Sequence, residues 1–269
     1  MSKTHSICVA NLNSMNTVRL WASSLLANLS EDDEVIIVDG MSTDGSQDFL
    51  TQFSRDHGFK FIAARTNIGQ ARQLALTHAK GEYVISQVDT DDEVVSLREA
   101  KRLYHEVIEH DPVTGAQRAF ICPEFFIIPR RMLIEIGGFP DLYYYEDQLT
   151  YYRLASRGQL TGSWKVSPAI RLTDPKKRRF LFRIYRTIRV IRDGLRMGFF
   201  DARNPQGFLL LIPGWLASLP MTHYDFRRDW WNLDVDRDEY IFPWIERERL
   251  SHKLMLEGIE GPRPPAAVA

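Results

Sequence analysis

Residues 82–92 read Glu-Tyr-Val-Ile-Ser-Gln-Val-Asp-Thr-Asp-Asp, an apolar run that passes directly into three carboxylates. The run from Tyr83 to Val88 is typical of a buried β-strand, and Asp89, Asp91 and Asp92 follow where that strand ends. In open α/β sheets ligands bind outside the carboxyl ends of the strands. Crowded carboxylates repel one another unless a cation joins them, and a divalent metal that carries substrate phosphates fits this need. The alternative is a solvated acidic turn that caps a helix starting near Val94.

Composition restricts the class of protein. The 269 residues are 44% hydrophobic and 26% charged with a net charge of −1, which is typical of a globular chain and gives no reason to expect nucleic-acid binding. Cys8 and Cys122 lie in apolar stretches and are interpreted as buried free thiols of a reducing compartment. The first residues lack the apolar stretch of a signal peptide, and no apolar run reaches the roughly 20 residues that span a bilayer. We therefore expect a cytoplasmic protein.

The first half of the chain alternates strand and helix patterns, which predicts βαβ units and a mostly parallel, Rossmann-like sheet flanked by helices. Strands are expected at 7–10, 35–38, 59–63 and 82–88, and at 119–128 with Pro123 interrupting. Helices are expected at 18–29, from 46, and at 68–79, 97–110, 129–136 and 147–157. We expect a catalytic domain over 1–170, a C-terminal helical extension over 171–260 and a disordered tail over 261–269.

The extension contains a basic amphipathic segment. Residues 176–197 carry nine Lys and Arg residues against one acid, Asp193. At 100° per residue the apolar side chains fall on one side and most arginines on the other. Such a helix binds an anionic membrane surface or packs its apolar stripe on the protein core. The apolar segment 207–219 that follows favours membrane contact.

Three further positions are candidate site residues. Asp39 ends a predicted strand, where a carboxylate accepts hydrogen bonds from a nucleotide base or ribose; taken alone, this position favours a turn residue. Arg72 lies in the first turns of a predicted helix, where a cation meets a diphosphate, unless it is an ordinary exposed arginine. Glu146-Asp147 follows three tyrosines, so that one carboxylate can act as a base in a sugar pocket or simply cap a helix.

Taken together, these segments resemble glycosyltransferase family 2 over roughly residues 5–160. The resemblance is carried, in order, by the motifs Val9–Asn13, Ile36–Ser46, Asn67–Arg72, Gly81–Val84, Asp89–Asp92, Gly137–Phe139 and Glu146-Asp147. It implies a nucleotide-diphospho-sugar transferase fold, a divalent metal (Mn²⁺ or Mg²⁺), a UDP- or GDP-sugar donor and inversion at the anomeric carbon.

The resemblance also implies roles by position. Asp39 corresponds to the acid that binds the base, and Arg72 to the arginine near the nucleotide. Asp89 corresponds to the first carboxylate of a D-x-D motif, near ribose and metal, and Asp91 to the metal ligand. Asp147 corresponds to the catalytic base. The remaining donor-binding positions implied are Ala10, Asn11, Asn13 and Glu146. Ala10 and Leu12 depart from the family's usual proline and aromatic, which affects base stacking rather than the chemistry.

The expected function is therefore sugar transfer to an acceptor hydroxyl. The acceptor is expected to be a lipid-linked glycan or a cell-surface polysaccharide precursor, and the protein would be peripheral at the inner face of the cell membrane through residues 176–197. One alternative is a non-catalytic membrane module with a retained transferase fold. A second, a sugar-nucleotidyltransferase, would need a Gly-rich basic loop after the first strand, and residues 11–16 contain no Gly, Lys or Arg.

Overall fold

The structure is a computed structural model. It describes residues 4–162, 167–172 and 180–197, together with residues 218, 220, 221, 223 and 224, and it describes side chains in the last helix only from residue 187 onward. The predicted tail 261–269, the segment 207–219 apart from Ser218, and the basic residues 176–179 all lie outside the described residues.

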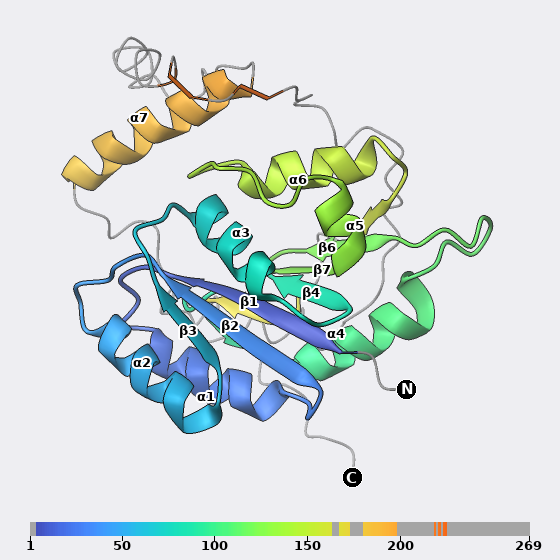
Figure 1. Ribbon diagram of the computed structural model, residues 1–269, viewed down its shortest axis with the longest axis horizontal. Coiled ribbons are helices and arrows are strands. Elements are labelled where there is room, and N and C mark those ends of the chain that lie inside the picture. Colours follow the sequence, from blue (N-terminus) through green and yellow to red (C-terminus); the bar gives the residue numbers. More distant parts are fainter. Residues whose placement is uncertain are drawn as a thin grey trace, which may run out of the picture.

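The described chain alternates helices and strands (Figure 1). The strands are β1 (His5–Asn11), β2 (Asp33–Asp39), β3 (Lys60–Ala63), β4 (Tyr83–Ser86), β5 (Asp92–Val94), β6 (Ala119–Cys122), β7 (Phe125–Pro129), β8 (Leu160–Gly162) and β9 (Ala169–Arg171). The helices are α1 (Val18–Asn28), α2 (Ser46–His57), α3 (Ile68–His78), α4 (Leu97–Leu103) with the wider π-helical turn η1 (Tyr104–Ile108), α5 (Arg130–Glu135), α6 (Glu146–Ala155) and α7 (Phe180–Arg196).

Seven strands form the central sheet in the order β3-β2-β1-β4-β7-β6-β8. The first four are parallel, β4 and β6 both run antiparallel to β7, and β8 returns parallel to β6. The predicted mostly parallel sheet is therefore confirmed. Because β1 and β2 pair from His5 opposite Asp33 to Asn11 opposite Asp39, the carboxyl ends of these strands meet at one edge.

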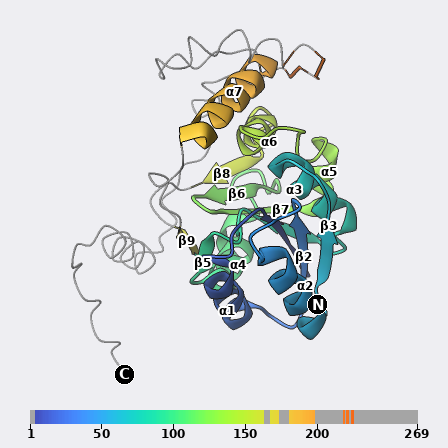
Figure 2. The ribbon, with the colours of Figure 1, turned by 90° about the vertical axis from the view of Figure 1, so that its left-hand side faces the viewer.

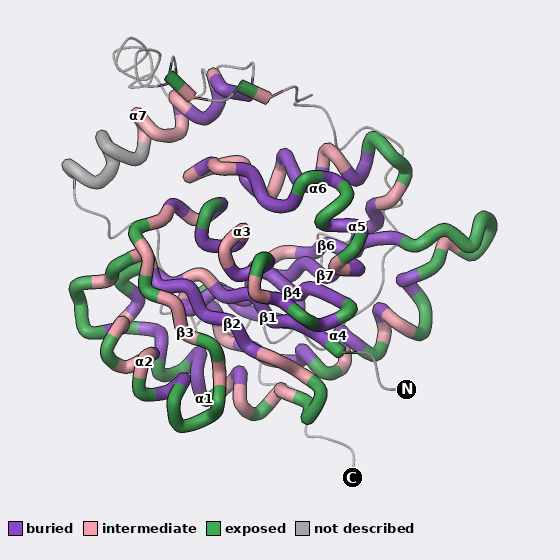
Figure 3. Tube along the Cα trace, viewed as in Figure 1, coloured by how far each residue is buried: buried purple, intermediate pink, exposed green. Residues whose placement is uncertain are grey.

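The sheet separates two hydrophobic cores. Alternate residues of each strand face opposite sides, so that Ile7 and Val9 pack below the sheet with α1, α2 and α4, whereas Cys8 packs above it with α3, α5 and α6. Figure 1 shows these two helix layers, and in Figure 3 the central strands between them are mostly buried, whereas the edge strand β3 is not. Burial on both faces explains the apolar centres of β1, β2 and β4.

The structure decides two local questions. The acidic residues lead into the short strand β5 and do not cap a helix near Val94, so that alternative was wrong; α4 begins at Leu97, where the helix over 97–110 was predicted to begin. The apolar stretch 119–128 is not one interrupted strand but a hairpin, in which Pro123 and Glu124 form the turn between β6 and β7. Glu124 has a φ of 54°, in the left-handed region that such tight turns use.

Strand β5 pairs antiparallel with β9 in a separate two-stranded sheet, with Asp92 opposite Arg171. This pairing connects the acidic turn after β4 to a segment 80 positions further along the chain. Figure 2 shows β5 and β9 beside α1 and α4, and α7 next to α6 on the opposite side of the central sheet.

Candidate active site

An open cleft of about 1210 Å³ lies at the carboxyl edge of the central sheet. Its walls come from the loops after β1 and β4, the beginning of α3, the segment that enters α6, strand β9 and helix α7. The predicted residues Ala10, Asn11, Asn13, Arg72, Asp89, Asp91, Glu146 and Asp147 all line it. The fold therefore brings together side chains from segments that are distant in sequence, at the place where parallel sheets bind ligands.

The centre of the cleft is a buried arginine bound to two carboxylates. Arg72 donates from Nη2 to Oδ2 of Asp89 and from Nη1 to Oε1 of Glu146, both at 2.7 Å. It is not an exposed helix arginine, because only 4% of it is accessible. Burial disfavours its charge, but the two carboxylates outweigh this and raise the pKa of Arg72 above its usual range. Arg72 therefore holds the loop after β4 against the start of α6.

Local sequence explains how Arg72 reaches this position. Asn67 and Gln70 form a capping box that starts α3, each side chain bonded to the other residue's backbone N–H. Gly69 lies between these two residues, and a Cβ at that position would lie 2.0 Å from the carbonyl oxygen of Pro140. Glycine therefore permits α3 to pack directly against the chain that leads into α6.

The Glu146-Asp147 pair opens α6. Tyr145 precedes the helix with a φ of 67°, so Asp147 lies in the first turn and is not the N-cap residue. Asp147 is half-buried, and its Oδ1 accepts a hydrogen bond of 2.7 Å from the Gln148 N–H. Burial raises the pKa of both Glu146 and Asp147, and nearby Arg72 opposes the rise in each case.

The three acidic residues after β4 have three different environments. Asp89 binds Arg72 and accepts a long hydrogen bond of 3.3 Å from the Ala10 N–H. Asp92 is fully buried and accepts from the Asp89 N–H at 3.0 Å. Asp91 faces the cleft and pairs with Arg171 at 2.9 Å. These contacts are not those of a solvated turn that caps a helix.

Asp39 does not line the cleft. It is fully buried, and its carboxylate accepts hydrogen bonds from Asn11 Nδ2 at 2.5 Å, from the Ser42 N–H at 2.8 Å and from Ser42 Oγ at 2.7 Å. Gly40, the next residue, does line the cleft. The structure thus shows Asp39 orienting Asn11 and the β2–α2 loop, and its contact with a nucleotide base stays a prediction.

Helix α7 forms the outer wall of the cleft. Asp193 is fully buried and accepts hydrogen bonds from the N–H groups of Tyr143 and Tyr144 at 2.7 and 3.1 Å. The guanidinium of Arg189 lies 4.1 Å from the centre of the Tyr143 ring, and Arg196 donates to the Asp141 carbonyl at 2.7 Å. The second half of the basic helix is therefore packed on the protein, which is the second of the two alternatives given for this segment. None of the described helices is long and apolar enough to cross a membrane.

The profile of glycosyl transferase family 2 matches residues 6–172, more than half of the chain. The chain belongs to this family. The match ends at the residues that complete the β5–β9 pair, so it includes every candidate site residue except those on α7.

Two curated relatives share part of the sequence. Cholesterol galactosyltransferase of Borreliella burgdorferi is 26% identical over 143 residues, which are 50% of this chain and 38% of that protein. Poly-beta-1,6-N-acetyl-D-glucosamine synthase of Staphylococcus epidermidis is 32% identical over 82 residues, or 30% of this chain and 20% of that protein. The chain thus spans less than two fifths of the length of these relatives.

Solved structures share the fold. A mannosyltransferase from Pyrobaculum calidifontis, in complex with GDP-Man and Mn²⁺, superposes with a TM-score of 0.57 at 18% identity, over 83% of this chain and 77% of that one. S. aureus TarS in complex with UDP-GlcNAc gives 0.53 at 18% identity, over 81% and 73%. These likenesses confirm the nucleotide-sugar transferase fold that the motifs predicted.

The divalent metal that the resemblance implies fits the residues present. Asp89 and Asp91 supply carboxylate oxygens to the cleft, which are the donors that Mg²⁺ and Mn²⁺ prefer. Among the described residues no group of three His, Cys, Asp or Glu side chains could hold a metal alone. This is compatible with Mg²⁺-type binding, in which one or two carboxylates are completed by substrate phosphates and water.

Sequence reasoning missed two residues of the cleft wall as parts of the site. Arg171 follows two apolar residues and carries no motif, so only the pairing of β9 with β5 reveals it. Arg189 was noticed as part of a basic helix, but its position over Tyr143 depends on how α7 docks. The spacing of basic residues could have suggested that a cationic side chain lies near the site, but it could not have shown which residue supplies that side chain.

Proposed function

We propose that this family member is a metal-dependent, inverting glycosyltransferase that moves a sugar from a UDP- or GDP-sugar to an acceptor hydroxyl. One observation carries the proposal: Asp89, Asp91 and Asp147 line a single cleft at the carboxyl edge of the sheet, and Arg72 ties two of the walls together. A donor held at Asp89 and Asp91 would lie in the same cavity as a candidate base.

The donor half of the site is the edge formed by β1, β2 and β4. Asn11 and Asn13 line this part of the cleft, and Arg72 holds Asp89 in place. Asp91 and Asp89 would hold Mn²⁺ or Mg²⁺, which when bound offsets the charge that builds on the departing nucleoside diphosphate. The solved neighbours that contain GDP-Man and UDP-GlcNAc share this fold, which supports a nucleotide-sugar donor.

The chemical step assigned to Asp147 is general-base catalysis. The acceptor oxygen forms a bond to the anomeric carbon as the bond from that carbon to the donor's phosphate oxygen breaks, and the hydroxyl proton passes to Asp147. Burial raises the Asp147 pKa, which strengthens its carboxylate as a proton acceptor. A single displacement inverts the centre and needs no covalent sugar–enzyme intermediate.

Glu146 and Arg72 position this base. Glu146 accepts from Arg72 at 2.7 Å and precedes Asp147 in the first turn of α6. The salt bridge fixes the start of the helix relative to Asp89. The base is therefore held at a constant place with respect to the donor carboxylates, as single-displacement chemistry requires.

The acceptor we propose is a lipid-linked glycan or a polysaccharide precursor at the inner membrane surface. The basic residues of 176–197 support it, since each Lys or Arg near an anionic surface contributes roughly 1 kcal/mol. The docked half of α7 retains Arg189 at the cleft, so a membrane-bound acceptor would meet the site directly. Liposome flotation of a variant with Lys176, Lys177, Arg178 and Arg179 changed to Glu tests this part, and unchanged binding to anionic vesicles would remove it.

The central experiment is a thermal-shift panel of UDP- and GDP-sugars with Mn²⁺, Mg²⁺ or EDTA. A ligand that binds only the folded state raises the unfolding temperature, so we expect a shift for one nucleotide class that needs the metal. Release of nucleoside diphosphate from the identified donor, with an acceptor extract, then tests transfer. Binding without any turnover would favour a non-catalytic module that retains the fold.

A further inference from the structure

A second arginine, Arg171, forms ion pairs with the carboxylates of Asp91 and Asp92 in the acidic turn. The β5–β9 pairing places it opposite Asp92, and its Nε lies 2.7 Å from Asp92 Oδ1. Its Nη1 donates to Asp91 Oδ2 at 2.9 Å, and the next N–H, that of Leu172, donates to the Asp91 carbonyl at 2.8 Å. One guanidinium therefore bridges two successive carboxylates.

The two carboxylates differ in accessibility. The Asp92 side chain is fully buried, whereas that of Asp91 is 24% exposed and that of Arg171 is 41% exposed. Asp92 also accepts the Asp89 N–H, so it belongs to the fixed framework of the turn. The contact between Asp91 and Arg171 is open to the cleft, and ligands can reach both partners.

The same Asp91 carboxylate is the one assigned to the divalent metal. A guanidinium and a metal ion are both cations that seek the same oxygens, so they compete for Asp91 rather than share it. A metal that binds alone at Asp91 is repelled by the charge of Arg171 and weakens or breaks the contact between Arg171 and Asp91 Oδ2. A donor diphosphate beside the metal would supply new oxygens to the N–H donors of Arg171, because Arg matches phosphate geometry with two parallel hydrogen bonds.

We propose that Arg171 is a resident counter-cation of the metal-binding carboxylate, which competes with the metal at Asp91 and transfers to the donor's diphosphate when metal and nucleotide bind together. This inference rests on the proposed function and adds a ligand for the diphosphate that the family match does not name. It makes metal and nucleotide binding mutually dependent: each ligand is bound better when the other is present.

The test is titration of Mn²⁺ followed by electron paramagnetic resonance, with Mn²⁺ alone and with saturating UDP or GDP. For the wild type we expect weak binding alone and tighter binding with the matching nucleotide. Arg171→Gln should bind Mn²⁺ alone more tightly, by about fivefold or more, and should lose most of the enhancement by nucleotide. Arg131→Gln is the matched control, because that arginine is on the surface of α5 with its side chain 91% exposed.

The sign of the change separates this role from a structural one. If Arg171 only supported the turn, its loss would loosen Asp91 and weaken Mn²⁺ binding, so weaker or unchanged affinity would overturn the inference. Arg171→Lys keeps the charge and should retain the coupling.

Arg171→Gln leaves the buried Asp92 without its cation, so the pair Arg171→Gln with Asp92→Asn is made in parallel and should show the same tighter Mn²⁺ binding. A wild type that binds no nucleotide with metal would contradict the proposed function instead. Normal wild-type coupling that persists in the glutamine variants would contradict the Arg171 assignment alone.

Discussion

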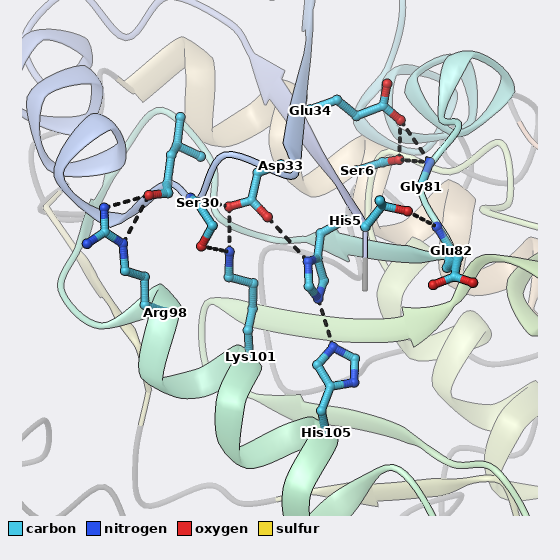
Figure 4. A network of polar contacts seen from close by, with 12 residues as sticks. His5, Ser6, Ser30, Asp33, Glu34, Gly81, Glu82, Arg98, Lys101 and His105 are labelled. Carbon is cyan, nitrogen blue, oxygen red and sulfur yellow. Dashed lines mark hydrogen bonds and ion pairs between the residues drawn. The ribbon is translucent and has the colours of Figure 1, made fainter. Parts of the chain in front are cut away.

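The same parallel strands bury charged groups at both of their ends, and the two ends have different uses. At the amino ends of β1 and β2, Asp33 binds Lys101 of α4 and lies 3.3 Å from His5, which in turn shares a hydrogen bond of 2.8 Å with His105 (Figure 4). At the carboxyl ends, Asp89 and Glu146 form ion pairs with Arg72, each at an N–O distance of 2.7 Å.

Burial of charge is therefore not what distinguishes the site. The Asp33 side chain is fully buried, that of Lys101 is 6% exposed, and neither residue lines the cleft. At the other end Asp91 and Asp147 present carboxylates to a cavity large enough for a substrate. The comparison indicates that the amino-end network ties α4 to the sheet, whereas the carboxyl end keeps charged groups available to ligands.

The largest expected effect is at Asp147. Asp147→Asn keeps the shape of the side chain but removes the proton acceptor, so we expect transfer to fall by about 10²–10⁴-fold. Donor binding should change little, because the donor carboxylates Asp89 and Asp91 are untouched. Steady-state kinetics with the identified donor, beside calorimetric donor affinity, measure the two quantities separately.

Asp56→Asn is the matched control for this prediction, since Asp56 is exposed on α2 and contacts only Gln52 by a hydrogen bond on that helix. Near-normal turnover in the Asp147 variant would show that another group accepts the proton. A parallel loss of donor affinity would instead show that Asp147 belongs to the donor half of the site.

The sequence predicts the framework better than the site. The sequence pattern places most strands because the central strands are buried on both faces, which leaves runs of apolar residues such as those in β2 and β4. The resemblance implied that Asp39, Asp91 and Asp147 serve one site; Asp91 and Asp147 line one cleft, whereas Asp39 does not line it. The resemblance did not identify Arg171, because this arginine reaches Asp91 through the pairing of β5 with β9, which depends on non-local packing.

Helix α7 illustrates a second limit. An amphipathic helix has the same pattern of residues whether its apolar stripe faces lipid or protein. Asp39 shows the same limit. The sequence pattern of a carboxylate at a strand end is the same whether the carboxylate binds a ligand or, as here, accepts hydrogen bonds from Asn11 and Ser42.

The second largest effect is at the amino end. Lys101→Met removes the cation of a buried pair and leaves Asp33 uncompensated, which should lower the free energy of unfolding by about 3–5 kcal/mol. Chemical denaturation measures it, with Lys60→Met on the exposed side of β3 as the control, expected within about 0.5 kcal/mol of wild type. Donor binding by the folded variant should stay unchanged. A loss of binding without a loss of stability would mean that the two ends do not have the separate uses inferred above.

A smaller effect is expected at Asp91. Asp91→Asn keeps the hydrogen bond geometry but weakens a metal ligand, so nucleotide affinity in Mn²⁺ should fall by at least about tenfold, or about 1.4 kcal/mol. In EDTA the variant should bind nucleotide at least as tightly as the wild type, because the metal no longer contributes and no carboxylate at position 91 holds Arg171. Calorimetry in the two buffers checks this, and an equal loss in both would assign Asp91 to the nucleotide directly rather than to the metal.

The smallest effect concerns Glu34, again at the amino end. Its carboxylate accepts hydrogen bonds from Ser6 Oγ at 2.5 Å and from the Gly81 N–H at 3.0 Å (Figure 4). Partial burial opposes ionisation, but these hydrogen bonds prevail and lower the pKa of Glu34. Glu34→Gln should therefore cost about 1 kcal/mol of unfolding free energy at neutral pH.

The pH dependence gives this last prediction its sign. A carboxylate whose pKa is lower in the folded protein contributes stability above its unfolded pKa, about 4.3 for Glu, and loses it as the pH falls through the folded value. The difference between wild type and Glu34→Gln should therefore be constant from pH 7 to about 5 and narrow below that range. Urea unfolding at several pH values measures it, with the exposed Glu135→Gln as the control. A difference that widens on acidification would show that Glu34 is stabilised as the neutral acid, and the two ends of the strands would then differ in protonation as well as in accessibility.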